Sequence, residues 1–506
     1  MTGHYLAFDL GTTALKTALV RDDGTVADVC SIEYTPDTPR PGWMEMDPAT
    51  YWRAAVAGTR TVLGSTSTPP SAVRGIGLSS QGETFVPLSP SGEPLAPALV
   101  WLDQRAADLT AEWEADWLTR DDFRRTSGYP AVLCELTVFK LAWLARHAPD
   151  LHRAHRFAFL PDYLALRLTG ELRTDYTQAL MSGLFDLRTG AWHPLLLEAA
   201  GVAPEQLPPV VRPGTVIGTV SAAAAEELGL PVGVPVCAGC NDQLAGALGA
   251  GNVGPGIVSE TMGTALAVVA TTEALLDSPV LCVGRHPVEP LHYAMAYAPT
   301  SAVVLKWFRD LVRPGASYDE IAAEAADVPI GSEGLMVLPY FCGSGPLTHN
   351  SAARGTIHGL TLAHGASHIA RAIMESCACL LMECLEPVVA SGVPVESIRS
   401  LGGAARSDLW LSMKADLAGM PVERPAETEA ACLGAAMMAA FGTGQFASLS
   451  EASLAWYRPA RVFHPAPDRR DAYRTVGERY RALRDALYRP STGRVPDPRD
   501  RGILPG

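Results

Sequence analysis

The stretch that decides the fold is Tyr5–Val20, which reads YLAFDLGTTALKTALV. An apolar run leads to Asp9, Gly11 permits a tight turn, and a second apolar run follows, so this stretch predicts a β-hairpin. Thr12 and Thr13 would gather hydroxyl and backbone N–H groups around one point. Such a turn can wrap phosphate oxygens, with the Asp9 carboxylate beside it to hold Mg²⁺. The alternative is an ordinary hairpin turn, because Asp, Gly and Thr all favour turns.

The same pattern returns at 256–270, which reads GIVSETMGTALAVVA. Here Gly263 and Thr264 take the place of the first Gly-Thr turn. The two stretches start about 250 residues apart, which is too far for a solenoid repeat and favours a duplicated domain. Two matching turns predict a nucleotide clamped between two halves of the chain.

Apolar runs alternate with longer amphipathic segments, which predicts a mixed α/β architecture. Dense glycines near 241–256 place the boundary between an N-terminal domain, 1–245, and a C-terminal domain, 246–490. The tail 491–506 is rich in Pro, Gly and charge and is expected to be loose. The strands expected in the first quarter are 5–10, 16–20, 72–80 and 97–101, and the helices are 47–63 and 104–118.

A carboxylate stands where an apolar strand gives way to a helix of small residues, in the segment Gly239–Gln243. A side chain at such a junction can face a cleft. Phosphorylation of an alcohol needs a base that accepts the hydroxyl proton, and Asp242 is our candidate for it. Gln243 could hydrogen-bond a neighbouring hydroxyl. The alternative is that Asp242 is a helix N-cap.

A glycine pair follows the apolar run that ends at Leu401. Gly402 and Gly403 would let the backbone approach a purine or ribose closely, and Ser407 is expected to cap the following helix. The segment 427–441 is rich in Ala and Gly and predicts a thin helix that packs closely. Plain helix-on-sheet packing is the competing interpretation of both segments.

Two further segments, Ser79–Thr84 and Trp101–Arg105, follow predicted strands in the first half. Their polar side chains are what a polyhydroxylated ligand needs, because each hydroxyl both donates and accepts a hydrogen bond. We therefore expect Gln81, Glu83 and Asp103 to contact substrate. Trp101 could stack on a sugar face or fill the core.

Composition narrows the possible functions. The chain has 506 residues, 48% of them hydrophobic, and a formal net charge of −14. This charge argues against nucleic acid as a partner. No apolar run is long enough to cross a membrane, and no Walker A loop is present. The N-terminal residues have no basic region and enter a strand pattern directly, so we expect no secretory signal. The ten cysteines form no metal-binding pattern and fit buried thiols in a reducing cytosol, so we expect a cytoplasmic protein.

Taken in order, these segments resemble the FGGY carbohydrate kinase family, whose members include xylulokinase and glycerol kinase. The resemblance runs from Tyr5 to about Tyr488 and includes 41–52, 161–176 and 402–422. It implies two RNase H-like domains of the actin-like ATPase type, with ATP in the cleft between them. It also implies a homodimer.

The resemblance assigns roles to individual residues. Asp9 corresponds to the metal-associated aspartate and Asp242 to the catalytic base. The cofactor positions that it implies are Thr12, Thr13 and Lys16 for the first phosphate segment, Gly263 and Thr264 for the second, and Gly402, Gly403, Ala404 and Ser407 for adenosine. The substrate strip is Gln81, Gly82 and Glu83.

The function that this implies is ATP- and Mg²⁺-dependent phosphorylation of a pentulose such as xylulose. Three alternatives stay open. Glu83-Thr84 also fits a glycerol- or erythritol-type polyol kinase. An actin- or Hsp70-like ATPase would share the phosphate turns. A catalytically inactive sugar sensor is the third, because the loop Cys342–Pro346 lacks the carboxylate and arginine usual in the family.

Overall fold

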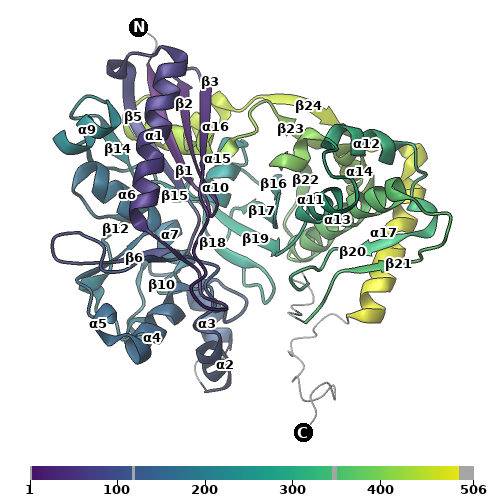
Figure 1. Ribbon diagram of the computed structural model, residues 1–506, viewed down its shortest axis with the longest axis horizontal. Coiled ribbons are helices and arrows are strands. Elements are labelled where there is room, and N and C mark those ends of the chain that lie inside the picture. Colours follow the sequence, from purple (N-terminus) through teal and green to yellow (C-terminus); the bar gives the residue numbers. More distant parts are fainter. Residues whose placement is uncertain (1–2, 117–119, 345–349, 351, 489–506) are drawn as a thin grey trace.

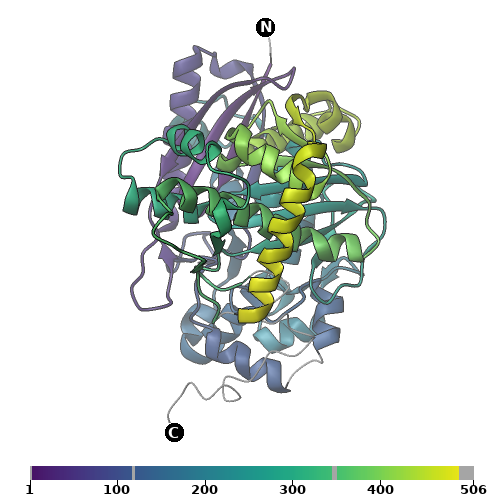
Figure 2. The same cartoon turned by 90° about the vertical axis from the view of Figure 1, so that its right-hand side faces the viewer.

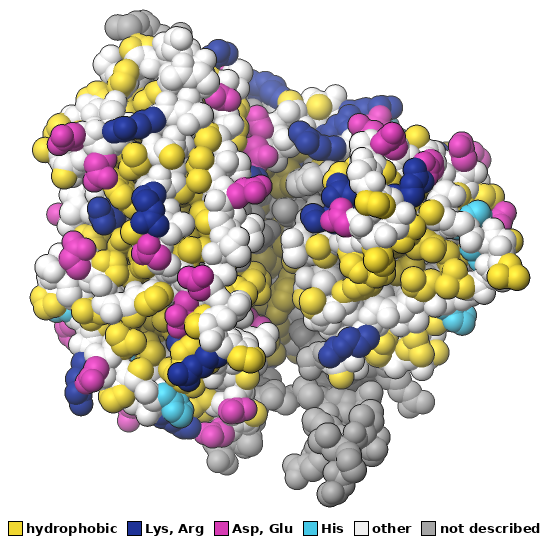
Figure 3. Space-filling model, viewed as in Figure 1, with side chains coloured by type: hydrophobic (Ala, Val, Ile, Leu, Met, Phe, Trp, Pro, Cys, Tyr) yellow, Lys and Arg dark blue, Asp and Glu magenta, His cyan; other side chains and the backbone are white. Residues whose placement is uncertain are grey.

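The computed structural model describes residues 3–116, 120–344, 350 and 352–488. The predicted loose tail 491–506 and the loop positions Gly345 and Pro346 lie outside the described residues. The chain forms two lobes (Figure 1), and a deep groove runs between them on the face drawn in Figure 3. Among the described helices, none combines the length and the apolar character that a bilayer crossing requires.

The N-terminal lobe is built on a seven-stranded sheet. Its order is β13 (Val216–Thr219), β14 (Pro235–Cys237), β5 (Val73–Ser80), β1 (His4–Leu10), β2 (Ala14–Arg21) and β3 (Val26–Glu33), with β15 (Cys240–Asn241) also paired to β5. Strands β1 and β2 form the predicted antiparallel hairpin, whereas β5 runs parallel to both β1 and β15.

Strand β1 is buried on both of its faces because successive side chains point in opposite directions. Tyr5 and Ala7 join the hydrophobic cluster that contains helix α15 (Ala430–Gly442). Leu6 and Phe8 join the cluster that contains helix α1 (Pro48–Thr66). The nearly continuous apolar sequence of this strand is therefore the consequence of a sheet covered by helices on both sides.

The C-terminal lobe repeats this topology. Its sheet has the order β18 (Cys282–Arg285), β19 (His292–Ala298), β17 (Leu266–Thr272), β16 (Gly256–Met262), β22 (Val395–Leu401), β23 (Val422–Pro425) and β24 (Pro459–Phe463). In each lobe a central strand, β1 or β16, has an antiparallel hairpin partner on one side and a parallel strand on the other. The predicted α/β duplication is confirmed.

Smaller elements complete the lobes. The minor sheets are β4 (Glu45–Met46), β7 (Ala98–Leu99), β6 (Phe85–Leu88) and β8 (Arg156–Phe159) together, then β10 (Phe185–Asp186) with β11 (Ala191–Trp192), β9 (Thr174–Asp175) with β12 (Val210–Val211), and β20 (Met336–Leu338) with β21 (Thr356–His358). The other helices of the first lobe are α2 (Ala107–Asp116), α3 (Arg120–Ser127), α4 (Thr137–His147), α5 (Pro149–His152), α6 (Leu160–Thr169), α7 (Tyr176–Met181), α8 (Pro194–Ala200), α9 (Ala222–Leu228) and α10 (Asp242–Gly249). Those that follow are α11 (Val303–Val312), α12 (Tyr318–Ala326), α13 (Ala366–Ala390), α14 (Asp408–Ala418), α16 (Leu449–Trp456) and α17 (Pro467–Leu487), the last of which crosses the outer face of the second lobe (Figure 2).

Most of the predicted elements of the first quarter are observed with small shifts. The helix expected at 47–63 begins at Pro48, because the side chain of Asp47 caps it by accepting a hydrogen bond from the Ala49 N–H (3.0 Å), and it continues to Thr66. The helix expected from 104 begins at Ala107. The strand expected at 97–101 is shorter, because only β7 pairs within the sheet.

Helix α15 belongs to the second half of the sequence but packs on the sheet of the first lobe, against β1 and β5, and against α10. Glycines permit this approach. A Cβ atom on Gly77 would lie 1.9 Å from the Ala435 carbonyl oxygen, and one on Gly434 would lie 2.0 Å from the Ala245 carbonyl oxygen. The thin helix predicted at 427–441 therefore serves close packing. The division at residue 245 stays a prediction, and this helix crosses it.

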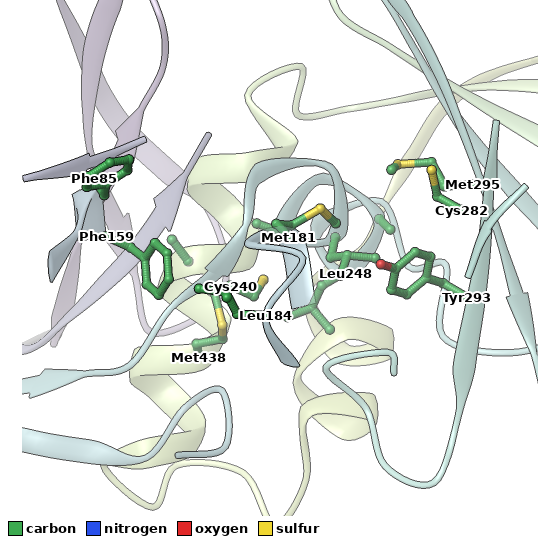
Figure 4. Packing of buried hydrophobic residues seen from close by; sticks show 14 of the residues in the cluster. Phe85, Phe159, Met181, Leu184, Cys240, Leu248, Cys282, Tyr293, Met295 and Met438 are labelled. Atoms are coloured by element: carbon green, nitrogen blue, oxygen red, sulfur yellow. The ribbon is translucent and has the colours of Figure 1, made fainter. Parts of the chain in front are cut away.

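The two halves also share apolar packing. One cluster joins Met181 of α7 and Leu248 of α10 to Cys282, Tyr293 and Met295 of the second sheet, as Figure 4 shows. Because these side chains are buried together, the lobes are joined by a continuous hydrophobic core in addition to the chain itself. This core lies next to the residues that form the candidate site.

We predict that Gly434→Ala lowers the free energy of unfolding by about 1–3 kcal/mol, because a methyl group has no room against the α10 backbone. Thermal unfolding followed by circular dichroism would measure it. The matched control is Gly246→Ala in α10, where a Cβ would find Leu401 Cδ1 at 3.6 Å, an ordinary contact. The control should be neutral or stabilising by up to about 1 kcal/mol. Equal melting temperatures for the two variants would contradict the close approach.

Candidate active site

Three parallel strands bring the predicted residues to one edge of the first sheet. Asp9 of β1 is in register with Ser79 of β5, and Ser79 is in register with Cys240 of β15. Gln81 follows β5 and Asp242 follows β15. Because the carboxyl ends of parallel strands share one edge, segments far apart in sequence meet there, and this edge is where ligands bind in open α/β sheets.

Asp242 is the first residue of α10, and the preceding residue, Asn241, is the N-cap of this helix. The side chain of Asn241 accepts a hydrogen bond from the Gln243 N–H (3.1 Å), so the N-cap interpretation of Asp242 is wrong. The Asp242 side chain is half-buried. Burial, together with the negative charges of Asp9 and Glu83, raises the pKa of Asp242 to about 8. A carboxyl group with such a pKa is suited to accept a proton near neutral pH.

Asp9 lies beside Asp242 and is held by Ser79, whose hydroxyl donates to Asp9 Oδ1 (2.8 Å). Burial raises the pKa of Asp9, although the Ser79 hydrogen bond and the charge of Lys16 oppose it. Within the described part of the chain, no three His, Cys, Asp or Glu side chains converge to hold a metal ion by themselves. The Asp9 carboxylate is an oxygen ligand of the kind that Mg²⁺ takes, with phosphate oxygens and water as its usual other ligands, and this role of Asp9 stays a prediction.

The first Gly-Thr turn is closed by a hydrogen bond from the Gly11 N–H to the Ala14 carbonyl (3.0 Å). Tyr34 supports it, since its hydroxyl donates to the Gly11 carbonyl (2.7 Å) and its N–H to the Thr13 carbonyl (2.9 Å). Thr13 is exposed. Among the described residues, no group accepts from the backbone N–H groups of Thr12 and Thr13, which leaves two donors for an anion.

The Thr12 hydroxyl is already engaged. It accepts from the Trp101 indole N–H (2.8 Å) and donates to Gln81 Oε1 (2.8 Å). Thr12 can therefore serve a phosphate through its backbone N–H, while its side chain links the turn to the substrate strip. Trp101 is half-buried, and its own backbone N–H donates to Thr84 Oγ1 (3.0 Å).

The second turn lies in the other lobe, at the end of β16. The Gly263 N–H donates to the Ala265 carbonyl (3.0 Å), and the Gly263 carbonyl accepts from the Val303 N–H at the start of α11 (3.0 Å). Thr264 is exposed. Among the described residues, nothing accepts from its backbone N–H, which matches the first turn.

The predicted adenosine segment adjoins this second turn. Gly402 has φ +76°, and a Cβ there would lie 3.1 Å from the Met262 carbonyl oxygen, so a glycine is needed beside the turn. Gly403 is exposed with open space above it, whereas Ala404 is buried. Ser407 caps α14 by accepting from the Trp410 N–H (3.3 Å), as predicted for a cap. Contact of these residues with a nucleotide stays a prediction.

The substrate strip follows β5. Gln81 is buried, and Gly82 packs so closely that a Cβ would lie 3.1 Å from the Met181 Cβ. Glu83 has φ +59°, a left-handed conformation that is rare for a residue with a side chain and occurs preferentially at functional sites. Its carboxylate accepts from the Tyr129 hydroxyl (2.8 Å), and burial raises its pKa to about 7. Gln243 is half-buried next to Asp242.

Asp103 is more deeply placed than predicted. Its carboxylate is fully buried and accepts hydrogen bonds from Arg105 (2.8 Å) and from the Met44 N–H (2.6 Å). Arg105 in turn pairs with Glu45 (2.7 Å). Direct contact between Asp103 and a ligand stays a prediction, and the observed contacts instead give it the role of holding the loop after Trp101.

Lys16 points toward the other half of the chain. Its ammonium group forms an ion pair with Glu429, the residue before α15. Although burial lowers the pKa of Lys16, the Glu429 carboxylate more than compensates, and the pKa is raised overall. The predicted phosphate contact of Lys16 stays a prediction, and Glu429 is a neighbour that sequence reasoning missed.

Lys140 was also missed. It is fully buried in α4, and its ammonium group donates to the carbonyls of Val100 (3.0 Å) and Trp101 (3.1 Å). Burial lowers its pKa to about 8, against the charges of Glu83 and other nearby acids. A lone lysine between Phe139 and Leu141 in an apolar helix was the available signal, because a buried charge needs specific partners.

Family models and relatives cover most of this chain. Residues 4–249 match the N-terminal domain, and residues 259–443 the C-terminal domain, of the FGGY family of carbohydrate kinases. Glycerol kinase of Methylibium petroleiphilum is 32% identical over 96% of this chain and 99% of the relative. Xylulose kinase of Staphylococcus epidermidis is 28% identical over 96% of both chains. The crystal structure of xylulose kinase from Rhodospirillum rubrum superposes with a TM-score of 0.86 at 30% identity, over 96% of this chain and 99% of that one.

The pKa of Asp242 predicts how stability depends on pH. Its folded-state value, about 8, exceeds the ordinary value of 3.8, so the folded protein binds more protons at this group between these limits. The stability that this group contributes is present below about pH 4 and is lost as pH rises through about 8. Asp242→Asn should therefore melt at a higher temperature than the wild type at pH 8, and the difference should shrink toward pH 4.

Differential scanning calorimetry in metal-free buffer would measure this difference. Asp150→Asn is the matched control, because the Asp150 side chain is 97% exposed. It should show no such pH-dependent gain. A constant offset between Asp242→Asn and the wild type from pH 4 to pH 8 would contradict the raised pKa.

Proposed function

This chain belongs to the FGGY family of carbohydrate kinases, and we propose that it transfers the γ-phosphate of ATP to a hydroxyl of an uncharged pentulose such as xylulose. The observation that carries the proposal is the position of Asp242. It lies at the strand edge shared by Asp9 and the strip Gln81–Glu83. One carboxyl group with a raised pKa thus stands between a candidate phosphate turn and a polar strip.

In the proposed reaction, Asp242 accepts the proton of the substrate hydroxyl as its oxygen attacks the γ-phosphorus in line. The bond from phosphorus to the bridging oxygen breaks, and ADP leaves. The N–H groups of Thr12, Thr13 and Thr264 stabilise charge on the phosphoryl oxygens from the two lobes. Asp9 would hold a Mg²⁺ ion, which would neutralise charge on the phosphates. Closure of the groove would exclude water from this reaction.

Charge around the strip supports an uncharged substrate. Glu83, Glu135 and Asp242 all lie near it. Besides burial, the charge of Glu135 raises the pKa of Glu83, and the charges of Asp9 and Glu83 raise the pKa of Asp242. Nearby cations are already engaged: Lys140 binds two carbonyls, and Arg105 pairs with Asp103 and Glu45. A substrate carboxylate would therefore lie among these acids, with Arg105 already paired to two carboxylates and Lys140 held by two backbone carbonyls.

A polyol kinase of the glycerol or erythritol type is the second candidate. Two observations favour it. Glu83 and Thr84 reproduce the acid and threonine of the glycerol kinase strip, and a relative named glycerol kinase is 32% identical to this chain. Both candidates share the same base, turns and uncharged acceptor, so substrate screening distinguishes them.

A coupled ADP-release assay across ketopentoses, glycerol, erythritol and aldonates tests the proposal. We expect the highest kcat/KM for a ketopentose and at least about tenfold lower values for aldonates, because like charges in a cleft repel. A preference for glycerol or erythritol would support the polyol kinase. An aldonate preference would contradict the charge argument. ATP turnover that no sugar stimulates would indicate an ATPase, and ligand-raised melting temperature without ADP release would indicate a sensor.

Asp242→Ala should lower kcat by about 10²–10⁴-fold, the usual contribution of a general base. Sugar and ATP should still bind, which isothermal titration calorimetry would measure, because the strip and the turns are intact. Asp150→Asn serves again as the control and should turn over normally. Near-normal turnover by Asp242→Ala would refute the assignment of the base.

A further inference from the structure

Four consecutive residues at the start of α7, Asp175 to Gln178, contact two parts of the candidate site: the segment before Asp242 and the segment before the substrate strip. All four are buried, with exposed fractions of 5% or less. None of them is a base, turn or strip residue in the proposed function. Their hydrogen bonds nevertheless reach Asn241, next to the base, and Ser80, next to the strip. We propose that Thr177 and Gln178 are positioning residues, which hold Asp242 and the substrate strip in fixed positions relative to each other; this inference rests on the proposed function.

The contact to the base side has a fixed direction. Thr177 has one hydroxyl proton, and it donates this proton to Asp175 Oδ1. The Thr177 oxygen can therefore only accept toward Asn241, and it accepts the Asn241 backbone N–H at 2.8 Å. Asn241 precedes Asp242 and caps α10, so the Thr177 hydroxyl fixes the point at which the base leaves the strand.

Asp175 binds the first turn of α7 through its side chain. Its Oδ1 also accepts from the backbone N–H groups of Thr177 (2.7 Å) and Gln178 (3.2 Å), which makes it the N-cap of α7. Burial raises its pKa to about 6, although these hydrogen bonds oppose the rise. The carboxyl group thus orients Thr177 and the start of the helix together.

The contact to the strip side comes from the next residue. The Gln178 amide Nε2 donates to the Ser80 carbonyl (3.0 Å), and the Ser80 hydroxyl donates to the Gln81 carbonyl (2.9 Å). Gln178 therefore fixes the chain where the strip begins. Because Thr177 and Gln178 are adjacent in one helical turn, the base and the strip are held relative to each other by a rigid element.

The same turn contacts the second half of the chain. The Tyr176 hydroxyl donates to the His286 carbonyl (2.8 Å), in the segment between β18 and β19. Met181, at the other end of α7, packs against the cluster that includes Cys282 and Tyr293 (Figure 4). The start of α7 is thus anchored from both halves, as expected of an element that must not move during the reaction.

Kinetic measurements on two variants test the Thr177 contact to Asn241 and the Gln178 contact to Ser80 separately. Thr177→Val keeps the shape of the side chain but leaves the Asn241 N–H without its acceptor. It should lower kcat by about 10–100-fold, because displacement of a catalytic group by about 1 Å has effects of this size. The KM for ATP should not change, and the pH midpoint of kcat/KM should shift with the environment of Asp242. Gln178→Met should instead raise the KM for the sugar and leave kcat largely intact.

Two variants control for a merely structural effect. Thr177→Ser restores the hydroxyl and should recover most of the wild-type kcat. Thr59→Val makes the same chemical change at a fully buried threonine of α1, whose hydroxyl donates only to the Ala55 carbonyl. It should lower the melting temperature without changing kcat or its pH profile.

The outcomes are distinguishable. A wild-type chain that phosphorylates none of the sugars would overturn the proposed function. An active wild type with Thr177→Val indistinguishable from Thr59→Val in kcat and pH profile would overturn the positioning role alone. Should Thr177→Val fail to accumulate as folded protein, Gln178→Met carries the test, and an unchanged KM for the sugar in that variant would overturn the role.

Discussion

Parallel pairing of β1, β5 and β15 is the constraint on which the candidate site depends. Each strand contributes little chemistry by itself: an aspartate, a serine, or a cap followed by a carboxylate. Pairing in register places these groups at one edge, where burial and mutual repulsion act on them together. The pKa of Asp242 is raised by burial and by the nearby charge of Asp9, and the pKa of Asp9 is raised mainly by burial at the same edge. A sheet that ended in another register would separate the same residues and leave them with ordinary chemistry.

Duplication supplies the second half of the arrangement. The strand order around β16 repeats that around β1, so each lobe presents a Gly-Thr turn whose threonine has a backbone N–H from which no described residue accepts a hydrogen bond. The lobes are not independent, however. Helix α15 leaves the second lobe to pack on the first, and a shared apolar cluster includes Met181 of α7 (Figure 4). Any movement across the groove in Figure 3 must therefore pivot about packed helices and not about a free linker.

Much of this could be predicted from the sequence, because the deciding signals are local. Apolar runs separated by turn residues predict the hairpins at Tyr5–Val20 and 256–270. Asp242 follows an apolar run and precedes a segment of small residues, which predicts a strand–helix junction. The missed residues act across distance. The hydrogen bonds of Thr177 and Gln178 span 64 and 98 residues, and the contact of Glu429 with Lys16 spans 413, so no local pattern marks these partners. The ion pair of Asp103 with Arg105, two positions away, was also not foreseen, because the sequence shows that arginine only as another polar residue.

The hydrogen-bond chain through Trp101, Thr12 and Gln81 can run in only one direction. An indole nitrogen can donate but never accept, so every later bond in the chain inherits its direction: Thr12 must pass its own proton on, and Gln81 must turn its oxygen to receive it. The oxygen of the Gln81 amide is thereby directed to Thr12, whereas its Nε2 is buried without a hydrogen-bond partner among the described residues. The Trp101 indole thus determines, through Thr12, which atom of the Gln81 amide faces the turn before any ligand binds.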